Sequence, residues 1–576
     1  MQPNREELPL ESLYRWERQR GERIFLTQPM GRGFRQWTWT QAADEVRRMA
    51  AYLRAQEWEP GSRIAILSKN CAWWILADLA VWMAGHVSVP IFPSLRPQSI
   101  RYILEHSGAV ACFLGATDEK VGPELSPLPG IRWISLPTAH EFARDTWQAI
   151  IESTARLVES PARGPNDLAT IIYTSGTTGT PKGVMHRFGA FGCNARVLTA
   201  LLNLGPDERI LSYLPLAHIV ERVAVEACAC RMGWHVSFSQ GIDTFLADLE
   251  RAQPTLFLSV PRLLVKFRQG VFAHIPKRHL DLLLHVPVVN SLVRHSVLRK
   301  LGLGAVVHAA CGAAPLPVEV LVWYRKLGLD LCEGYGMTET MITHLPRPGS
   351  VRPGYVGAAI ECVESQVSPE GELLIRSPMN MLGYYRDPAA TRAAFTPEGF
   401  FRTGDLVTTA PDGQVRIVGR LKEQFKTSKG EYVVPAPIEG RLMAHPAVEA
   451  CCVMGAGQAS PFAVLVISEA ERARCADPGV RAAFEKSLDT CMQAINQELE
   501  PYARIGMIVI ADGPWTTASG FLTPTFKLKR GVLESRYQAL VDEWRARNTT
   551  VVWQSLPGDC VLAPTSGPSL QPDEAS

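Results

Sequence analysis

The chain has 576 residues, of which 46% are hydrophobic and 20% are charged, as is typical of a folded protein with two or more domains. Its net charge of +2, with no basic run and no zinc-finger spacing, excludes a nucleic-acid-binding protein that relies on a strong positive field. The 13 cysteines are odd in number and include no C-x-x-C pair, which favours reduced thiols in the cytoplasm.

The N-terminal region contains one segment that could be mistaken for a membrane span. Met1–Leu10 is polar and acidic, which predicts that no signal peptide is present. Cys71–Phe92 is almost entirely apolar and about as long as a membrane-spanning helix. However, Asp78 lies near its middle, and Val87–Phe92 is rich in residues that favour strands. We therefore predict a helix over 71–85 followed by a buried strand.

Apolar, β-rich runs alternate with amphipathic helical stretches over the first 310 residues or so. This alternation predicts an α/β fold with layered, largely parallel sheets. The strands expected are Ser62–Leu67, Val110–Leu114, Ile171–Tyr173, Leu256–Val260 and Ala305–Ala310. From about Ser365 a small, antiparallel, β-barrel-like piece is expected, with strands at Gly371–Arg376 and Gln414–Val418. Asp412–Gly413, just before the second of these, is a hairpin turn signal.

The domain organisation follows from these changes along the chain. A large N-terminal domain is predicted over 1–420, a small α+β C-terminal domain over 421–545, and a polar, disordered tail over 546–576. The small domain is expected to contain the strands Val448–Met454 and Phe462–Ile467 and the helix Val480–Leu499.

A loop rich in glycine and threonine follows the apolar run Leu168–Ile172. Tyr173–Gly183 contains three glycines, five Ser or Thr residues and one lysine, Lys182. Glycines allow backbone N–H groups to approach phosphate oxygens, hydroxyls add donors, and the lysine adds a positive charge. It is not a Walker loop, because Lys182 follows a proline and precedes a glycine. The predicted phosphate-binding residues are Thr174, Ser175, Gly176, Thr177, Thr178, Gly179 and Lys182.

Four further motifs follow this loop in chain order: Gly334–Thr340, Arg402–Asp405, Gly419–Lys422 and Leu522–Arg530. Together with the loop they resemble the adenylate-forming superfamily of acyl-CoA synthetases, luciferases and peptide-synthetase adenylation domains. Segments 211–222, 260–262 and 311–316 are most similar to long-chain fatty acyl-CoA synthetases, and the resemblance covers most of residues 10–545. One departure is Gly419, where many relatives carry Asp.

The resemblance implies roles for the nucleotide-binding residues. Tyr335 would lie against adenine, Thr338 would reach the α-phosphate, and Glu339 would hold Mg²⁺ between its carboxylate and the phosphates of ATP. The other nucleotide-binding residues implied are Gly312, Ala313, Ala314, Gly336, and the ribose-binding Asp405 and Arg420.

The resemblance also implies a small domain that rotates between two half-reactions. Lys422 would be the hinge, and Lys429 and Gly430 would approach the pantetheine of CoA. Lys527 would bridge the acyl carboxylate and the nucleotide. Lys529 is the alternative, but Lys529–Arg530 is more typical of a solvated pair.

The expected function is ATP-dependent activation of a medium- to long-chain fatty acid to acyl-AMP, with pyrophosphate release, followed by transfer to CoA. His218 would line the acyl-carboxylate site or serve only as a structural hydrogen-bonding group. Two alternatives stay open: a ligase that loads an acyl carrier protein, and a non-catalytic relative that binds nucleotide or fatty acid. A cytoplasmic protein is expected, with peripheral membrane contact left open because fatty acids partition into bilayers. Acyl chain length and oligomeric state are not set by the sequence.

Overall fold

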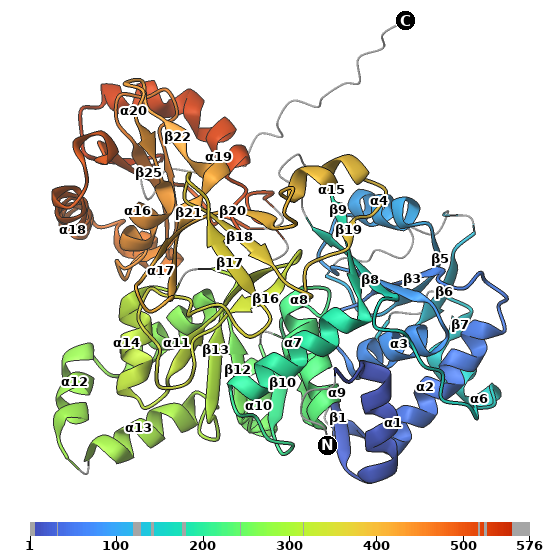
Figure 1. The fold of residues 1–576 in the computed structure, drawn as a ribbon. Coiled ribbons are helices and arrows are strands. Elements are labelled where there is room, and N and C mark those ends of the chain that lie inside the picture. The colour runs from blue at the N-terminus through green and yellow to red at the C-terminus, as the bar shows by residue number, and fades with distance from the viewer. Residues whose placement is uncertain are drawn as a thin grey trace, which may run out of the picture. The chain divides into compact units, whose positions relative to one another are not determined.

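The chain divides into two compact units, Met1–Ile417 and Val418–Ser576, here called the N-terminal and C-terminal units (Figure 1). Their elements come from a computed structural model. It describes residues 6–31, 33–118, 128, 130–139, 143–174, 180–241, 243–287, 289–314, 316–516, 519–523 and 527–555.

The N-terminal unit contains two large, mainly parallel sheets. The eight-stranded sheet has the order β19-β9-β8-β4-β3-β5-β6-β7, in which β9 runs antiparallel to both of its neighbours. Its strands are β3 (Arg63–Leu67), β4 (Val87–Ile91), β5 (Ala109–Leu114), β6 (Arg132–Ser135), β7 (Asp145–Thr146), β8 (Leu168–Thr174), β9 (Lys182–Arg187) and β19 (Gly383–Tyr384).

The seven-stranded sheet has the order β14-β13-β12-β10-β11-β1-β2, and only β2 is antiparallel to its neighbour. Its strands are β1 (Ile24–Met30), β2 (Gly33–Thr38), β10 (Arg209–Ser212), β11 (His235–Phe238), β12 (Leu256–Ser259), β13 (His308–Cys311) and β14 (Leu331–Glu333). The five strands predicted for this part of the chain are therefore present, and the prediction of largely parallel sheets is confirmed.

The predicted helix over 71–85 is α3 (Ala72–Met83), and the strand after it is β4. Every residue of α3 is buried, because the helix contacts β3 and β4 of one sheet and β1 of the other. Its all-round apolar character thus reflects a position between two sheets. Within the described residues, no helix combines the length and apolarity needed to cross a membrane.

The remaining helices of the N-terminal unit cover the sheets or connect their strands (Figure 1). They are α1 (Pro9–Gln19), α2 (Trp39–Arg54), α4 (Pro97–Ser107), α6 (Trp147–Ser153), α7 (Phe188–Leu201), α8 (Ile219–Glu221), the π-helical turn η1 (Arg222–Ala227), α9 (Cys228–Met232), α10 (Phe245–Ala252), α11 (Pro261–His274), α12 (Lys277–His285), α13 (Val289–Lys300), α14 (Val318–Lys326) and α15 (Pro388–Ala394).

Short antiparallel strands follow β14. The hairpin of β15 (Tyr335–Met337) and β16 (Met341–His344) precedes a four-stranded sheet of order β17-β18-β20-β21. The strands of that sheet are β17 (Glu364–Val367), β18 (Glu372–Arg376), β20 (Phe401–Thr409) and β21 (Val415–Arg420). The turn predicted at Asp412–Gly413 is present: Gly413 has φ +80°, and its N–H donates to Ala410 O at 2.9 Å.

The C-terminal unit is built on a four-stranded sheet of order β24-β25-β26-β27. One face packs against α16 and α18, and the other against α19 and α20. Its elements are η2 (Leu421–Glu423), β22 (Phe425–Lys426), β23 (Tyr432–Val433), α16 (Pro435–Leu442), β24 (Val448–Met454), β25 (Phe462–Ile467), α17 (Glu469–Arg474), α18 (Pro478–Gln497), η3 (Pro501–Ala503), β26 (Met507–Ile510), α19 (Arg530–Tyr537), η4 (Gln538–Leu540), α20 (Val541–Ala546) and β27 (Val551–Trp553).

The prediction that a disordered tail begins at residue 546 is wrong. Val551–Trp553 forms β27, which pairs in parallel with β26 and buries Val552 and Trp553. β27 forms the edge of the four-stranded sheet. The polar composition of the surrounding residues gave no sign that this segment would pair with a distant strand. Residues 556–576 lie outside the described residues.

Candidate active site

The strand–loop–strand arrangement predicted for phosphate binding is centred on β8 and β9. Thr174 ends β8, Lys182 begins β9, and the two residues are paired across the antiparallel ladder. The predicted residues between them, Ser175, Gly176, Thr177, Thr178 and Gly179, lie outside the described residues.

Tyr384 connects the phosphate-loop lysine with the predicted metal ligand. Its hydroxyl donates to Glu339 Oε1 at 3.0 Å, and Lys182 Nζ lies 5.1 Å from the centroid of its ring. Burial and the Glu339 carboxylate both raise the pKa of Tyr384, so its phenol stays protonated and remains a donor at neutral pH. The pairing of Val184 with Tyr384 in the β9–β19 ladder positions this side chain.

The backbone of Thr338 is held by a buried histidine. His186 on β9 donates from Nε2 to Thr338 O at 2.6 Å. Because a carbonyl oxygen only accepts, the proton must be on Nε2. Burial lowers the pKa of His186 to about 4, so the ring is neutral at pH 7. One strand, β9, therefore carries both Lys182 and the residue that anchors the Thr338–Glu339 backbone.

Two of the residues predicted to contact adenine and ribose, Tyr335 and Asp405, meet in the N-terminal unit. Tyr335 donates its hydroxyl hydrogen to Asp405 Oδ2 at 2.6 Å, and Asp405 is buried. The Asp405 backbone is held by Thr403, whose Oγ1 accepts from Asp405 N at 3.0 Å. Between them Gly404 has φ +70°, a conformation that favours glycine. The hairpin that presents Tyr335 requires Gly336, because a Cβ there would collide with Met341 O.

Gly312, Ala313 and Ala314 come directly after β13, at the carboxyl edge of the seven-stranded sheet. A Cβ on Gly312 would lie 3.2 Å from Gly334 O, so this position favours glycine. Ala313 is exposed and has φ +69°, a left-handed conformation that costs a non-glycine residue roughly 1–3 kcal/mol. Such strain is common at ligand sites, and it lies here beside the segment that carries Tyr335.

His218 occupies the N-cap of α8. Its side-chain Nδ1 accepts from Val220 N at 3.3 Å, and its backbone N–H donates to Pro215 O at 2.8 Å. The capping bond assigns the acceptor role to Nδ1, so Nε2 carries the proton in the neutral ring. A structural role is thus present, and a role at the acyl carboxylate stays a prediction.

A fully buried charge cluster lies behind the phosphate-loop strand. Arg222, at the start of η1, donates to Thr170 Oγ1 on β8 at 2.6 Å and forms an ion pair with Asp78 of α3. Glu226 also pairs with Arg222, at 3.4 Å. The guanidinium carbon lies 5.3 Å from the ring centroid of Trp82. Arg222 thus ties together β8, α3 and the π-helical turn, and π-helical turns are frequent near functional sites.

The predicted residues of the C-terminal unit lie on its first strands and turns. Arg420 ends β21, and Lys422 is an exposed residue of η2. A Cβ on Gly419 would collide with Val434 Cγ1, so this position favours glycine in this chain. Lys429 and Gly430 form the exposed turn between β22 and β23, where Gly430 has φ +88°.

Hydrogen bonds join the two described sides of the lysine loop, whose residues 524–526 lie outside the described residues. Thr523 N donates to Lys527 O at 2.8 Å, and Lys527 N donates to Thr523 Oγ1 at 3.0 Å. Leu522 and Leu528 form the bridge behind this pair. The Lys527 side chain is exposed while its backbone is held, which suits a group that must reach a ligand.

Arg530 is not part of a solvated pair, contrary to the prediction from its sequence neighbours. Its Nη2 donates to both Glu439 oxygens, at 2.7 and 2.9 Å, and its Nη1 donates to Val453 O at 2.8 Å. Only 12% of its side chain is exposed. Arg530 therefore joins α19 to α16 and β24, whereas Lys529 is exposed.

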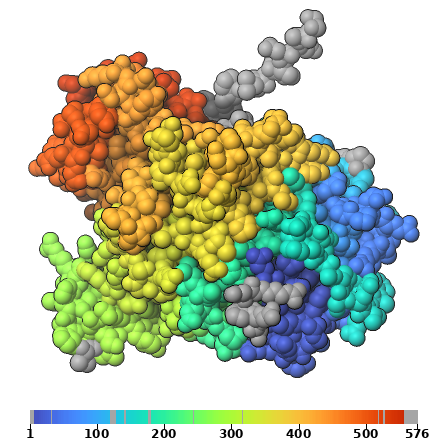
Figure 2. Space-filling view, in the orientation of Figure 1, coloured from blue at the N-terminus to red at the C-terminus, as the bar shows by residue number. Residues whose placement is uncertain are grey.

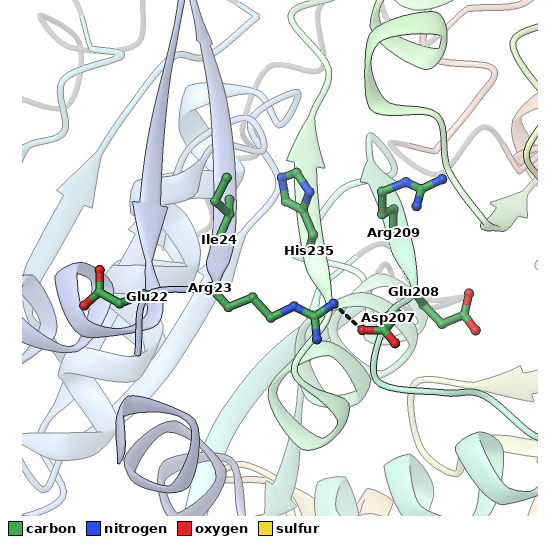
Figure 3. Close-up of a pocket in the computed structure, with 7 residues that line it drawn as sticks. All are labelled: Glu22, Arg23, Ile24, Asp207, Glu208, Arg209 and His235. Atoms are coloured by element: carbon green, nitrogen blue, oxygen red, sulfur yellow. Dashed lines mark hydrogen bonds and ion pairs between the residues drawn. The ribbon is translucent and has the colours of Figure 1, made fainter. Parts of the chain in front are cut away.

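A pocket elsewhere on the N-terminal unit contains none of the predicted site residues (Figure 3). It lies at the amino ends of β1, β10 and β11, and the Arg23–Asp207 ion pair crosses it. Gly312 and Gly334, in contrast, follow the carboxyl ends of β13 and β14, where ligands bind in open parallel sheets. The pocket is lined by Glu22, Arg23, Ile24, Asp207, Glu208, Arg209 and His235.

Each of the two units matches a known sequence family. Residues 13–385 match the AMP-binding enzyme family, and residues 422–548 match the AMP-binding enzyme C-terminal domain. The chain belongs to the AMP-binding enzyme family. The resemblance to adenylate-forming enzymes is therefore confirmed.

Curated relatives of this AMP-binding enzyme include long-chain acyl-CoA ligases. It is 31% identical over 562 residues to the long-chain-fatty-acid–CoA ligase FadD15 of Mycobacterium bovis. That alignment covers 88% of this chain and 91% of the ligase. It is 30% identical over 548 residues to long-chain-fatty-acid–CoA ligase 1 of Homo sapiens, with 84% and 78% covered.

Solved structures support the fold of this AMP-binding enzyme. The adenylation domain of a carboxylate reductase from Mycobacterium chelonae aligns with a TM-score of 0.78 at 22% identity, covering 94% of this chain and 92% of that one. The anthranilate CoA ligase AuaEII, solved with anthranoyl-AMP, aligns with a TM-score of 0.76 at 20% identity, covering 93% and 98%. The predicted α/β fold with a smaller C-terminal domain is thereby confirmed.

Sequence motifs did not reveal Tyr384 or His186. His186 lies four residues after Lys182 in what looks like an ordinary strand, and Tyr384 follows a glycine in a short apolar run. Their contacts depend on the pairing of β9 with β8 and β19, which joins segments almost 200 residues apart.

Proposed function

We propose that this enzyme activates a medium- to long-chain fatty acid with ATP and transfers the acyl group to CoA. The observation that carries the proposal is the chain of contacts that begins at Lys182, on the strand that follows the phosphate loop, and runs through Tyr384 to Glu339. The long-chain acyl-CoA ligases among its relatives support the choice of substrate class.

The first half-reaction would convert a poor leaving group into a good one. A carboxylate oxygen attacks the α-phosphorus of ATP, the bond from that phosphorus to the bridging oxygen breaks, and pyrophosphate leaves. Negative charge collects on phosphate oxygens, so catalysis depends on positioning and electrostatics. Lys182 would contact the β- and γ-phosphates, Thr338 the α-phosphate, and Asp405 with Arg420 the ribose.

Glu339 is suited to a magnesium ion that ATP shares. Within the described residues, no cluster of three or more His, Cys, Asp or Glu side chains could hold a metal by itself. Magnesium at nucleotide sites commonly uses one or two carboxylates together with phosphates and waters, which a single Glu339 matches. When bound, the ion would neutralise phosphate charge, and Tyr384 would orient the Glu339 carboxylate through its hydroxyl.

The second half-reaction would release AMP and form the thioester. The sulfur of CoA attacks the acyl carbon of acyl-AMP, the bond from that carbon to the AMP oxygen breaks, and the thiol proton passes to solvent or a base. We propose that the C-terminal unit rotates about Lys422 between the two steps, and that Lys429 and Gly430 then approach the pantetheine.

Lys422→Pro is expected to reduce acyl-CoA output by roughly 10²-fold while a first turnover still releases pyrophosphate. Proline fixes φ near −65°, a value compatible with η2, so it restricts the hinge without unfolding the turn. Quenched-flow measurement of pyrophosphate and acyl-CoA separates the steps. Lys422→Ala, which removes the charge but keeps backbone freedom, should retain both; full acyl-CoA output from Lys422→Pro would exclude Lys422 as the hinge.

Asp405→Ala is expected to raise the KM for ATP by roughly 10- to 100-fold, the effect of losing a hydrogen bond to a charged group. The substitution removes the proposed ribose acceptor and also the partner of Tyr335. Steady-state kinetics at saturating fatty acid measures the change. Asp412→Ala, in the exposed β20–β21 turn, is the matched control and should leave the KM unchanged. An unchanged KM in Asp405→Ala would contradict the ribose assignment.

ATP–pyrophosphate exchange driven by a panel of carboxylic acids tests the proposed function most directly. Exchange that depends on medium- to long-chain fatty acids is expected, and its absence with every acid would favour the non-catalytic alternative. Supplying either CoA or a phosphopantetheinylated carrier protein then shows which of the two accepts the acyl group. Formation of acyl-CoA is expected.

We propose a cytoplasmic location with peripheral membrane contact. All 12 cysteines within the described residues are free thiols, as expected in a reducing compartment. A fatty acid substrate would be supplied largely from bilayers, which gives the enzyme a reason to approach one.

A further inference from the structure

One segment of the N-terminal unit carries an unusual concentration of positive charge. Residues 261–300, which form α11, α12 and α13, contain eight Lys and Arg residues against a single acidic residue, a net charge of +7 with His neutral. The whole chain carries +2, so the other residues together carry −5. The charge of this segment therefore opposes that of the rest of the protein.

The single acid of the segment does not offset its exposed cations. Asp281 on α12 pairs with Lys326 of α14 at 3.1 Å, so its charge is directed toward a neighbouring helix of the same unit. The exposed basic residues of the segment are Arg262, Lys266, Lys277, Arg278, Arg299 and Lys300.

The same helices expose aliphatic side chains. Leu282 is 66% exposed and Leu292 is 69% exposed, and Leu283 and Val286, the residue that follows α12, are also exposed. Such residues are normally buried, and a group of them on adjacent helices is more informative than one alone. The pattern is therefore apolar and basic together, on one pair of helices.

Each of these two helices has one side buried against the protein and an opposite side that is exposed. On α12, Leu280 and Leu284 are buried one turn apart, and Leu282 projects from the opposite side. On α13, Val297 is buried, whereas Leu292 and Arg299, seven residues apart, share the opposite side. Leu282 and Leu292 therefore lie on the outward sides of their helices.

Within the N-terminal unit, α12 and α13 lie at the outer end of the light-green region (Figure 1). In the space-filling view this region protrudes from its surroundings at the lower left (Figure 2). Both helices are therefore at the periphery of the N-terminal unit.

We propose that α12 and α13 dock this protein onto an anionic lipid surface. Leu282, Leu283, Val286 and Leu292 would enter the boundary between headgroups and acyl chains, and the flanking Lys and Arg residues would contact lipid phosphates. Interfacial helices bind by this combination of buried apolar area and attraction to anionic lipids. The proposal does not depend on the enzyme's reaction.

A lipid surface fits these residues better than nucleic acid or an acidic protein. Nucleic acid recognition uses basic residues with polar or aromatic partners, and it would leave four exposed aliphatic side chains against phosphates. An acidic protein would need a matched apolar groove, whereas a bilayer accepts aliphatic side chains in any arrangement.

Vesicle co-sedimentation of the full chain tests the proposal. Vesicles of phosphatidylcholine alone are compared with vesicles of equal parts phosphatidylcholine and phosphatidylglycerol. Binding to the anionic vesicles is expected, with sharp weakening at high salt because the attraction is partly electrostatic. Failure to bind the anionic vesicles, or equal binding to both kinds, would overturn the proposal.

Two pairs of substitutions locate the surface. The double variant Leu282→Asn with Leu292→Asn should weaken partitioning onto anionic vesicles by at least about tenfold, since two inserting side chains are lost. The double variant Arg278→Gln with Arg299→Gln should weaken it by roughly 30-fold and reduce the salt dependence. If either double variant bound the anionic vesicles as well as the unmodified chain does, the assignment to α12 and α13 would be overturned.

Matched controls separate docking from folding and from catalysis. Val158→Asn changes a residue that is 94% exposed elsewhere in the same unit, and Lys486→Gln with Arg536→Gln removes two exposed charges from the C-terminal unit. Both should bind vesicles like the unmodified chain, and loss of binding in either would overturn the assignment to α12–α13. ATP–pyrophosphate exchange with a water-soluble medium-chain fatty acid should be equal in all variants. Failure of the proposed function would abolish exchange in every variant without changing the vesicle result.

Discussion

Lys527→Ala is expected to slow acyl-adenylate formation by roughly 10²–10³-fold, the effect of removing one preorganised electrostatic donor. The backbone of Lys527 is held on both sides by Thr523, through Thr523 N to Lys527 O at 2.8 Å and Lys527 N to Thr523 Oγ1 at 3.0 Å. The loop therefore fixes where the side chain begins, and the ammonium group can be directed at the reacting carboxylate and phosphate.

The two half-reactions of Lys527→Ala should be affected unequally. ATP–pyrophosphate exchange reports the first half-reaction, and thioester formation from supplied acyl-AMP reports the second. The rate of the first half-reaction should fall by the full factor of roughly 10²–10³, and that of the second by much less. The reason is that the C-terminal unit is proposed to rotate and remove this lysine before the thiol attacks. An equal fall in both would show that Lys527 does not have the proposed role.

Lys529→Ala is the matched control, since Lys529 is also exposed and lies two residues away. Its N–H donates to Phe521 O at 2.8 Å, a backbone bond that alanine preserves. Adenylation should therefore be nearly unchanged. If adenylation slowed more in Lys529→Ala than in Lys527→Ala, the catalytic role would be assigned to Lys529 and not to Lys527. Arg530 is unsuitable as a control, because its ion pair with Glu439 holds the C-terminal unit together.

Arg222→Leu is expected to lower the free energy of unfolding of the N-terminal unit by about 3–5 kcal/mol, the usual cost of removing one partner from a buried ion pair. Asp78 and Glu226 would be left as buried carboxylates without their cation, and Thr170 on β8 would lose its donor. Urea unfolding followed by tryptophan fluorescence measures the loss, since Trp74 and Trp82 lie 5.5 and 5.3 Å from the guanidinium.

The destabilisation by Arg222→Leu should grow as the pH rises. Burial is the main reason that the pKa of Glu226 is raised well above its ordinary value, and the Asp78 carboxylate raises it further. A carboxyl group with a raised pKa in the folded state must take up a proton to fold. The resulting penalty is absent below the unfolded pKa near 4.5 and increases above it. Without Arg222 this penalty should be larger at pH 8 than at pH 5.

A rescue variant makes the cause of the Arg222→Leu effect testable. Adding Asp78→Asn and Glu226→Gln to Arg222→Leu removes both orphaned charges, and replacing a whole buried ionic group is often close to neutral. The triple variant should recover most of the lost stability and lose the pH dependence. A triple variant as unstable as Arg222→Leu would instead assign the effect to packing against Trp82 and Phe191.

Particular residues show how far local sequence was informative. The helix over 71–85 and the strand after it were predicted correctly, although the segment resembled a membrane span, because Asp78 and the strand formers at Val87–Phe92 are local signals. The structure shows why Asp78 is tolerated there: it pairs with Arg222, 144 residues away. That partner could not have been found from spacing.

The same contrast applies to the candidate site. Tyr335 and Asp405 were both predicted from their motifs, and the structure joins them by a hydrogen bond of 2.6 Å. Tyr384 and His186 were missed, although one contacts Glu339 and the other contacts Thr338. Arg530 was misjudged, because its partner Glu439 lies 91 residues earlier in the chain.

Local sequence was sufficient for the strands, the main helices and the family, because periodicity, turn residues and short motifs are properties of neighbouring residues. The partners of buried charged and polar groups depended on the tertiary structure. A buried Arg, Glu or Tyr must be paired by whatever the fold brings near it, and strand pairing brings together segments that are distant in the chain. For this reason the supports of the site, Tyr384, His186 and Arg222, became visible only after folding.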